Sequence, residues 1–191
     1  MPHAYCCIDV EASGPVPGLF DLVSIGAVAV QADPDGRHRL SSEPWHVLVA
    51  PQGGRQLEEA MAIHGIPAGQ LEAEGRPLAE AMQALTDWAR SQQRDPEQRL
   101  VFVGHNAPFD WSYISYCYHA CELENPFGWK ALDTKALAMG RLDLDWFDTN
   151  KETLETRLSL PEQDASRVHQ ADYDALYQAE ILCALLDHRS A

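Results

Sequence analysis

A buried-looking segment that ends in two carboxylates constrains this sequence most. Residues 4–10 are almost wholly apolar, and Asp9 and Glu11 stand at alternate positions where the run ends. Residues two apart in a β-strand project from the same face, so the two carboxylates are expected side by side. At a separation of roughly 4 Å and an effective dielectric near 20, two such charges repel by about 4 kcal/mol. A cation between them relieves this repulsion, whereas an acidic strand end open to water is the simpler alternative.

The pattern of apolar residues predicts a chain that begins with strands and ends with helices. The Asp33-Pro34-Asp35-Gly36 stretch is a turn signal, so the second and third strands are expected to form a hairpin. A later apolar run lies between helices and is expected to be parallel to the first strand. The expected strands are residues 4–10, 22–31, 38–49, 100–104 and a short piece within 127–133.

Helical periodicity is clearest in residues 77–93, where Pro77 suits the first turn and an apolar stripe follows. With the strands, the helices predict an α/β fold whose mixed sheet starts with three antiparallel strands and carries helices on both faces. In such sheets the functional site lies at the strand ends, near a switch in strand order. The other expected helices are residues 56–63, 109–119, 134–139, 150–158 and 170–186.

Size and charge limit what the chain can be. Its 191 residues are expected to form a single domain, residues 1–191, with a sizeable core. A net charge of −15 argues against a salt-driven grip on long duplex nucleic acid, but leaves room for a local site that holds a few nucleotides. No apolar run approaches the roughly 20 residues of a membrane span, and no basic leader precedes the first strand. With cysteines in apolar runs, the cytoplasm is the expected location.

Three further polar residues are candidates for the same site as the first-strand pair. Asp110 begins the helix after the fourth strand, where a carboxylate also suits the helix dipole without any function. His169 and Asp174 stand five residues apart around the start of the last helix. Carboxylates without thiolates suit a hard divalent ion, Mg2+ or Mn2+.

Together these residues resemble a known family. The patterns Asp9-x-Glu11, Asn106-x-x-Phe109-Asp110 and His169-x4-Asp174 are similar to the three motifs of the DEDDh 3'-to-5' exonucleases, which include RNase T and the proofreading epsilon-type subunits. The segment around His64 also resembles the family's segment after the third strand. A tyrosine variant of the superfamily has Tyr four residues before the last Asp; that position is Gln170 here, so the histidine type is favoured.

The resemblance implies an RNase H-like fold, with a five-stranded mixed sheet, and a two-metal mechanism using Mg2+ or Mn2+. Asp9 would bridge the two ions, Glu11 and Asp174 would complete the coordination of one, and Asp110 would hold the other. His169 would be the general base, since histidine suits proton transfer at neutral pH. The reaction would be hydrolysis at the 3' ends of DNA or RNA, preferably single-stranded, with release of 5'-nucleotides.

The candidates for substrate contact are less closely determined. The backbone amides at Ala12, Ser13 and Gly14 are expected to meet the terminal nucleotide. Aromatic rings suit stacking on bases, which is worth about 1–3 kcal/mol per base. The other candidate residues for nucleotide contact are His64, Asn106 and Phe109.

Other functions remain open at this stage. A non-catalytic or weakly active proofreading-like module, bound to a polymerase or another protein, would carry the same motifs. A phosphoesterase for small nucleotides or sugar phosphates, or a short-oligomer ribonuclease suggested by the acidity, would use the same residues. The sequence leaves the choice between DNA and RNA undecided, and also whether the protein is a homodimer.

Overall fold

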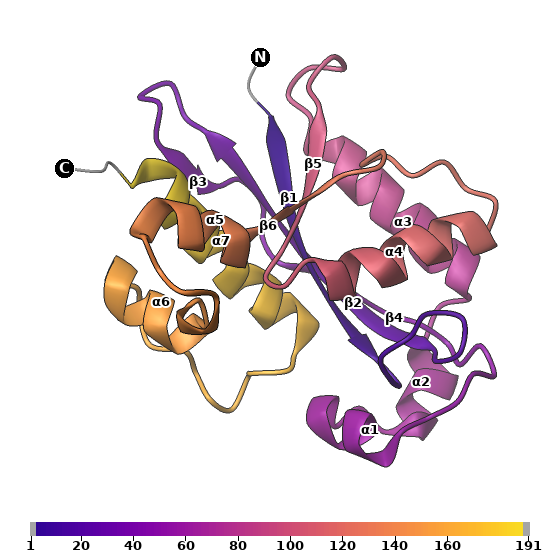
Figure 1. Cartoon of the computed structure of the whole chain (residues 1–191). Helices are drawn as coiled ribbons and strands as arrows, with labels where there is room; N and C mark the ends of the chain where they lie inside the picture. The colour runs from indigo at the N-terminus through magenta and orange to yellow at the C-terminus, as the bar shows by residue number, and fades with distance from the viewer. Residues whose placement is uncertain (1–2, 189–191) are drawn as a thin grey trace.

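The computed structural model of the chain describes residues 3–188, which are built on a mixed β-sheet (Figure 1). The strand order is β3-β2-β1-β5-β6, and β4 also pairs with β2. β2 is antiparallel to β1, β3 and β4, whereas β5 is parallel to both β1 and β6. The strands are β1 Ala4–Ala12, β2 Leu22–Ala32, β3 His38–Leu40, β4 Trp45–Leu48, β5 Leu100–Gly104 and β6 Ala131–Asp133.

The third expected strand is divided into two, β3 and β4, which lie one after the other along β2. Pro44 precedes β4 and has no N–H to give to the ladder. At the break, the Ser42 hydroxyl accepts the hydrogen bond of the Ala29 N–H at 3.0 Å, so β2 stays satisfied there. The sheet therefore has the predicted antiparallel start with one interrupted edge.

Helices cover both faces of the sheet, as predicted (Figure 1). α3 and α4 pack on one face and α7 on the other, while α1 and α2 lie beyond the ends of β1 and β2. α2 was not expected from the sequence, because it has a single buried apolar residue, Leu71, and therefore no periodicity. The helices are α1 Glu58–His64, α2 Ala68–Glu74, α3 Leu78–Ser91, α4 Pro108–Ala120, α5 Thr134–Leu142, the 3-10 helix η1 Trp146–Asp148, α6 Lys151–Leu158 and α7 Ala171–Asp187. In the described part of the chain, none of them is long and apolar enough to cross a membrane.

The alternation of side chains along β1 decides which helix the acidic residues meet. Cys6, Ile8 and Val10 belong to the core beneath α3 and α4, whereas Cys7 packs against α7. Asp9 and Glu11 have the parity of Cys7, so they project toward the α7 face. The strand's hydrophobic pattern thus aims both carboxylates at the last helix.

A glycine lets α7 come down onto the sheet beside these carboxylates. Gly26 is the cross-strand partner of Asp9. A Cβ placed on Gly26 would stand 2.0 Å from the backbone carbonyl of Ala171, at the first residue of α7. Only a residue without a side chain permits this approach, and it brings the first turn of α7 next to Asp9.

We predict that Gly26→Ala destabilises the protein by about 3 kcal/mol or more, the upper end of the cost of overpacking, because the methyl group meets backbone rather than a side chain that can turn aside. Urea unfolding measures this. Gly140→Ala is the matched control: Gly140 lies inside α5 with open space around its Cβ position. It should be neutral or stabilising by up to about 1 kcal/mol. Equal stability of Gly26→Ala and the unaltered protein would contradict the close approach of α7.

Candidate active site

Four carboxylates from three elements line one cleft at the ends of the strands. Asp9 and Glu11 come from β1, Asp110 from the first turn of α4 and Asp174 from the first turn of α7. Glu11, Asp110 and Asp174 are buried, and Asp9 is half-buried. The cleft has a volume of about 360 Å³ and is lined by Asp9, Val10, Glu11, His105, Asn106, Phe109, Asp110, Lys151, Val168, His169 and Asp174. The structure therefore brings together all five residues predicted to be catalytic.

The parallel pairing of β1 and β5 places Asp110. Both strands end at the same edge of the sheet, and β5 leads through a short turn into α4. Asp110 Oδ1 accepts a hydrogen bond from the Val10 N–H at 3.0 Å, between Asp9 and Glu11 in the sequence. This bond ties the start of α4 directly to the acidic end of β1.

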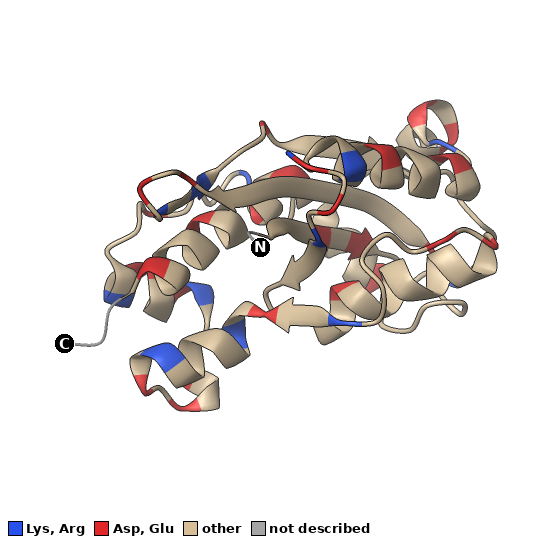
Figure 2. Cartoon of the chain, turned by 90° about the horizontal axis from the view of Figure 1, so that it is seen from above, with Lys and Arg blue, Asp and Glu red and all other residues tan. Residues whose placement is uncertain are grey.

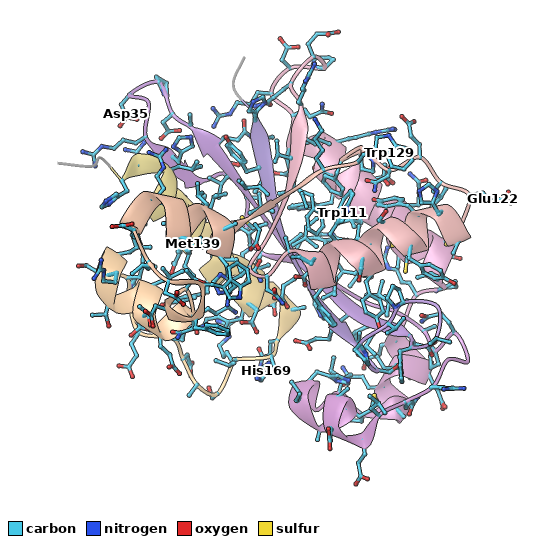
Figure 3. All side chains as sticks on the ribbon, in the orientation of Figure 1. Asp35, Trp111, Glu122, Trp129, Met139 and His169 are labelled. Carbon is cyan, nitrogen blue, oxygen red and sulfur yellow. The ribbon has the colours of Figure 1, made fainter. Side chains whose placement is uncertain are left out.

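His169 lies just before α7, on the side of the molecule where α1 lies (Figure 3). Its backbone N–H donates to Asp174 Oδ2 at 2.7 Å, and its φ of +67° is in the left-handed region. The side chain is exposed, and its ring offers a nitrogen within a group of ligand atoms from Glu11, His169 and Asp174 that all lie within 4.8 Å of one another. A backbone held in an uncommon conformation by a buried carboxylate is typical of functional sites.

Burial makes three of the carboxylates, Asp9, Glu11 and Asp110, hard to ionise, and the charges of neighbouring carboxylates add to this effect. Burial raises the pKa of Glu11 to about 8, and the charges of Asp174 and Asp110 add to the shift. Burial raises the pKa of Asp110 to about 7, although backbone hydrogen bonds oppose the shift. The pKa of Asp9 is raised well above its ordinary value, first by burial and then by Asp110 and Asp174. The positive charge of Lys151 opposes all three shifts.

Lys151 is a residue of the site that sequence reasoning missed. Its ammonium group, at the start of α6, forms an ion pair with Asp174 Oδ1. Among the described residues, it is the only cationic side chain in an ion pair with one of the four carboxylates. No spacing links Lys151 to the acidic motifs. The position of the lysines in the sequence was the one feature that could have pointed to it, because every lysine of this acidic chain falls between residues 130 and 151.

Gln178 and His105 were also missed, and they hold the floor of the cleft. Gln178, one turn after Asp174, donates from Nε2 to Asp9 Oδ1 at 2.5 Å and accepts the His105 N–H at 3.2 Å. Burial and the nearby positive charges of Lys151 and Lys135 lower the pKa of His105 to about 3, so its ring is neutral at physiological pH. The sequence did not mark Gln178 as a site residue, because its position on α7 falls within the buried face of the helix.

The residues present fit divalent cations. The four carboxylates supply hard oxygen donors, and the described residues set a single ammonium group against them in an ion pair. Buried carboxylates with raised pKa values are the groups that a bound cation would stabilise in their ionised form. The chemistry of the donors thus suits Mg2+ or Mn2+ rather than a soft, thiolate-binding metal.

An apolar cavity of about 370 Å³ adjoins the acidic cleft, and Glu11 and Phe109 line both. Of the predicted contact residues, Ala12, Gly14 and Phe109 line this cavity, while the exposed Asn106 lines the acidic cleft. The cavity is lined by Glu11, Ala12, Gly14, Pro15, Leu57, Glu59, Ala60, Ile63 and Phe109.

Ser13 and His64, the other two predicted contacts, are buried and line neither space. Ser13 donates from its hydroxyl to the Arg55 carbonyl at 2.7 Å and accepts the Asp21 N–H at 2.8 Å, while its own N–H donates to the Asp21 carbonyl. His64 Nδ1 accepts the Ile66 N–H at 3.0 Å, and its buried Nε2 has no partner among the described residues. Ser13 thus shapes the loop around the cavity from within.

The fold is that of the DEDDh nucleases. The nuclease domain of 3'hExo, described as a DEDDh family member and bound to rAMP, matches 94% of this chain and 90% of its own with a TM-score of 0.76 and 13% identity. Exonuclease I matches 98% of this chain and 41% of its own, with a TM-score of 0.73 and 17% identity. These structures confirm the predicted RNase H-like fold class.

Sequence comparison identifies the family. The family model RNase_T, described as an exonuclease, matches residues 6–182. The 3'-5' DNA exonuclease Cap18 of Escherichia coli is 34% identical over 177 residues, 93% of this chain and 88% of that protein. Ribonuclease T of Yersinia enterocolitica is 32% identical over 185 residues, 94% of this chain and 83% of that protein. The chain belongs to the RNase T exonuclease family and is a 3'-5' exonuclease of the DEDDh type, which confirms the predicted enzyme class.

The raised pKa values predict how the stability of the metal-free protein depends on pH. The ordinary pKa values are 4.5 for Glu11 and 3.8 for Asp110, against about 8 and about 7 in the folded chain. Between these limits the folded state binds more protons than the unfolded state, so stability falls as pH rises from about 4 to about 8. In chelator, thermal unfolding midpoints should decline across this range.

Saturating Mg2+ should weaken the decline, because the ion replaces the protons that the cluster otherwise retains. Glu11→Gln should reduce the decline without any ion. The same pH dependence with and without Mg2+, at concentrations that support activity, would contradict the assignment of this cluster as a cation site.

Proposed function

We propose that this cleft hydrolyses the terminal phosphodiester of unpaired 3' ends of DNA or RNA and releases 5'-nucleotides, and that residues 1–191 form one exonuclease domain. The observation that carries the proposal is the junction of the two spaces. Glu11 and Phe109 line both the acidic cleft and the apolar cavity. A nucleotide seated there would place its base among apolar side chains and its phosphate before the carboxylates.

The apolar cavity suits one unpaired base. Its walls come from the loop after β1, from Leu57 and Ile63 on the α1 side, and from Phe109 on α4. At about 370 Å³ the cavity is at the small end of ligand pockets. A base inserted between Ile63 and Phe109 would leave its Watson–Crick partner outside, so a frayed or single-stranded end is favoured.

Divalent ions held by Asp9, Glu11, Asp110 and Asp174 would neutralise charge at the attacking and leaving oxygens and make water acidic enough to react at neutral pH. Asp9 would contribute to both ions, with Glu11 and Asp174 on one and Asp110 on the other. The chain's own contribution is to orient these groups. Gln178 fixes Asp9 Oδ1, and the Val10 N–H fixes Asp110 Oδ1.

His169 would accept the proton of the attacking water. Its imidazole is exposed at the mouth of the cleft, while its backbone N–H is held by Asp174, so the ring is placed beside the carboxylates without being buried among them. His105 has no comparable role, because a pKa lowered to about 3 makes its ring a weak base and its Nδ1 lies 2.8 Å from the Thr134 hydroxyl. Lys151 would offer its charge to the substrate phosphate once Asp174 has another cation to bind.

The relatives leave both polymers as candidate substrates. One similar protein is named as a DNA exonuclease and others are named Ribonuclease T. The apolar cavity would contact a base through its apolar side chains, which suits either polymer. Oligomers of DNA and RNA are therefore both needed in the assay.

We expect Asp9→Asn to abolish Mg2+-dependent shortening of 3'-unpaired oligonucleotides, because it removes a carboxylate proposed to serve both ions. His169→Gln should lower kcat by about 10²- to 10⁴-fold, the usual contribution of a general base, while ion binding by calorimetry is retained. The assay uses 5'-labelled single strands and blunt duplexes of DNA and RNA, and follows the ladder of products.

His38→Gln is the control histidine, since His38 pairs with Asp187 away from the cleft and lines a different cavity. It should leave kcat within about twofold of the unaltered value. Full activity of Asp9→Asn would contradict the proposal, and so would cleavage at internal phosphodiester bonds instead of at the 3' terminus. Faster cleavage of dimers than of longer strands would instead indicate a short-oligomer ribonuclease.

A further inference from the structure

The turn between α5 and α6 leaves aromatic rings open to solvent. Phe147 is 83% exposed and Trp146 is 39% exposed. The turn itself is well bonded: Asp145 accepts the Phe147 N–H at 3.1 Å, Thr149 donates to the Trp146 carbonyl at 2.6 Å, and Asn150 donates to the Phe147 carbonyl at 3.4 Å. One exposed apolar side chain is ordinary, but two adjacent rings presented by an ordered turn form a surface.

Cationic side chains accompany these rings. Lys135 Nζ lies 5.0 Å from the centre of the Trp146 ring, within range of a cation–π interaction. All the lysines of the sequence, Lys130, Lys135 and Lys151, fall on the segment that contains this turn. The same segment also holds Arg141 and four aspartates, Asp133, Asp143, Asp145 and Asp148. Residues 130–151 therefore carry no net charge, in a chain of net charge −15 whose acidic residues are spread over many elements (Figure 2). Rings combined with cations suit single-stranded nucleic acid, because bases stack and phosphates are anionic.

A short stretch of chain connects this turn to the active-site cleft. Lys151 follows Phe147 by four residues, at most about 14 Å of extended chain, and reaches Asp174 inside the cleft. Lys135 and Lys151 both act on the pKa of His105, whose ring lines the cleft. A strand that leaves the cleft beside Lys151 would therefore lie within five residues of chain of the two rings.

We infer that Lys135, Trp146 and Phe147, here called the aromatic–lysine surface, hold single-stranded nucleic acid upstream of the terminal nucleotide, with one base stacked on Phe147. This inference rests on the proposed function and deepens it. Residues 130–151 carry no net charge in a chain of net charge −15, so this segment repels a polyanion less than the average surface of the protein does, and its two exposed rings can stack on bases. The short chain connection to the cleft favours the same occupant, since the substrate must leave the cleft on some side.

The decisive variants change the ring of Phe147 and nothing else. Phe147→Leu keeps an apolar side chain but cannot stack, and Phe147→Trp keeps a stacking ring; at 83% exposure neither should disturb folding. On single-stranded decamers Phe147→Leu should raise KM by roughly 5- to 150-fold, the range that one stacked base supplies, with kcat nearly constant. Phe147→Trp should restore the KM. Leu40→Ala, an exposed apolar residue on the edge strand β3, is the control for any apolar loss.

Two substrates identify the partner of the ring. A nucleoside 5'-(p-nitrophenyl phosphate) has no upstream base, so the Phe147→Leu defect should be absent on it. Decamers with one abasic site, moved along the strand from the 3' end, locate the stacked base. At the stacked position, the loss from the abasic site and the loss from Phe147→Leu should not add, whereas at other positions they should.

Three results would overturn the inference. They are an unchanged KM of Phe147→Leu on decamers, an equal loss on the p-nitrophenyl substrate, and additive losses at every abasic position. A change in sedimentation from dimer to monomer on Phe147→Leu would also overturn it, by showing that the surface joins two copies of the chain. Failure of the unaltered enzyme to shorten any decamer would contradict the proposed function instead, and fluorescence anisotropy of the decamer with Ca2+ present would then test the surface alone.

Discussion

The crowding of four carboxylates, three buried and one half-buried, into a cleft with one ammonium group is the constraint on which the rest of this structure depends. In a cleft where water screens charges poorly, burial raises the pKa values of Asp9, Glu11 and Asp110, and for Asp9 and Glu11 the charges of Asp110 and Asp174 add to the shift. The positive charge of Lys151, paired with Asp174, opposes these shifts. Native folds retain such a cluster at a cost in stability, so the excess negative charge is best understood as the preparation of a cation site.

The architecture gathers this charge with simple means. Side chains alternate between the two faces along β1, so Asp9 and Glu11 project toward the α7 face. Gly26 allows the first turn of α7 to pack beside them. The parallel strand β5 leads into α4, whose first turn places Asp110 at the same edge of the sheet. The apolar cavity adjoins this acidic centre through Glu11 and Phe109, and Lys151 of the same centre follows Phe147 of the aromatic–lysine surface by four residues. A polymer whose end is cut in the cleft could therefore pass outward over that surface.

Much of this could be predicted from sequence, for identifiable reasons. The parity of Asp9 and Glu11 follows from strand geometry, and the order of the motifs pointed to a family that the comparisons confirm. Contacts between distant segments outside the family's motifs could not be predicted. Nothing local marks Lys151 or Gln178 as neighbours of Asp174 and Asp9, because their places depend on how α6 and α7 pack. The inward position of Ser13 likewise depends on a loop that closes on Asp21 and Arg55.

The most direct measurement of the central claim is calorimetric titration of the metal-free protein with Mn2+ at neutral pH, paired with the anomalous scattering of crystals grown with the same ion. The account predicts saturable binding, with anomalous peaks among the four carboxylate side chains and the ammonium group of Lys151 moved away from Asp174. Peaks located elsewhere, or no binding at concentrations that support catalysis, would contradict it.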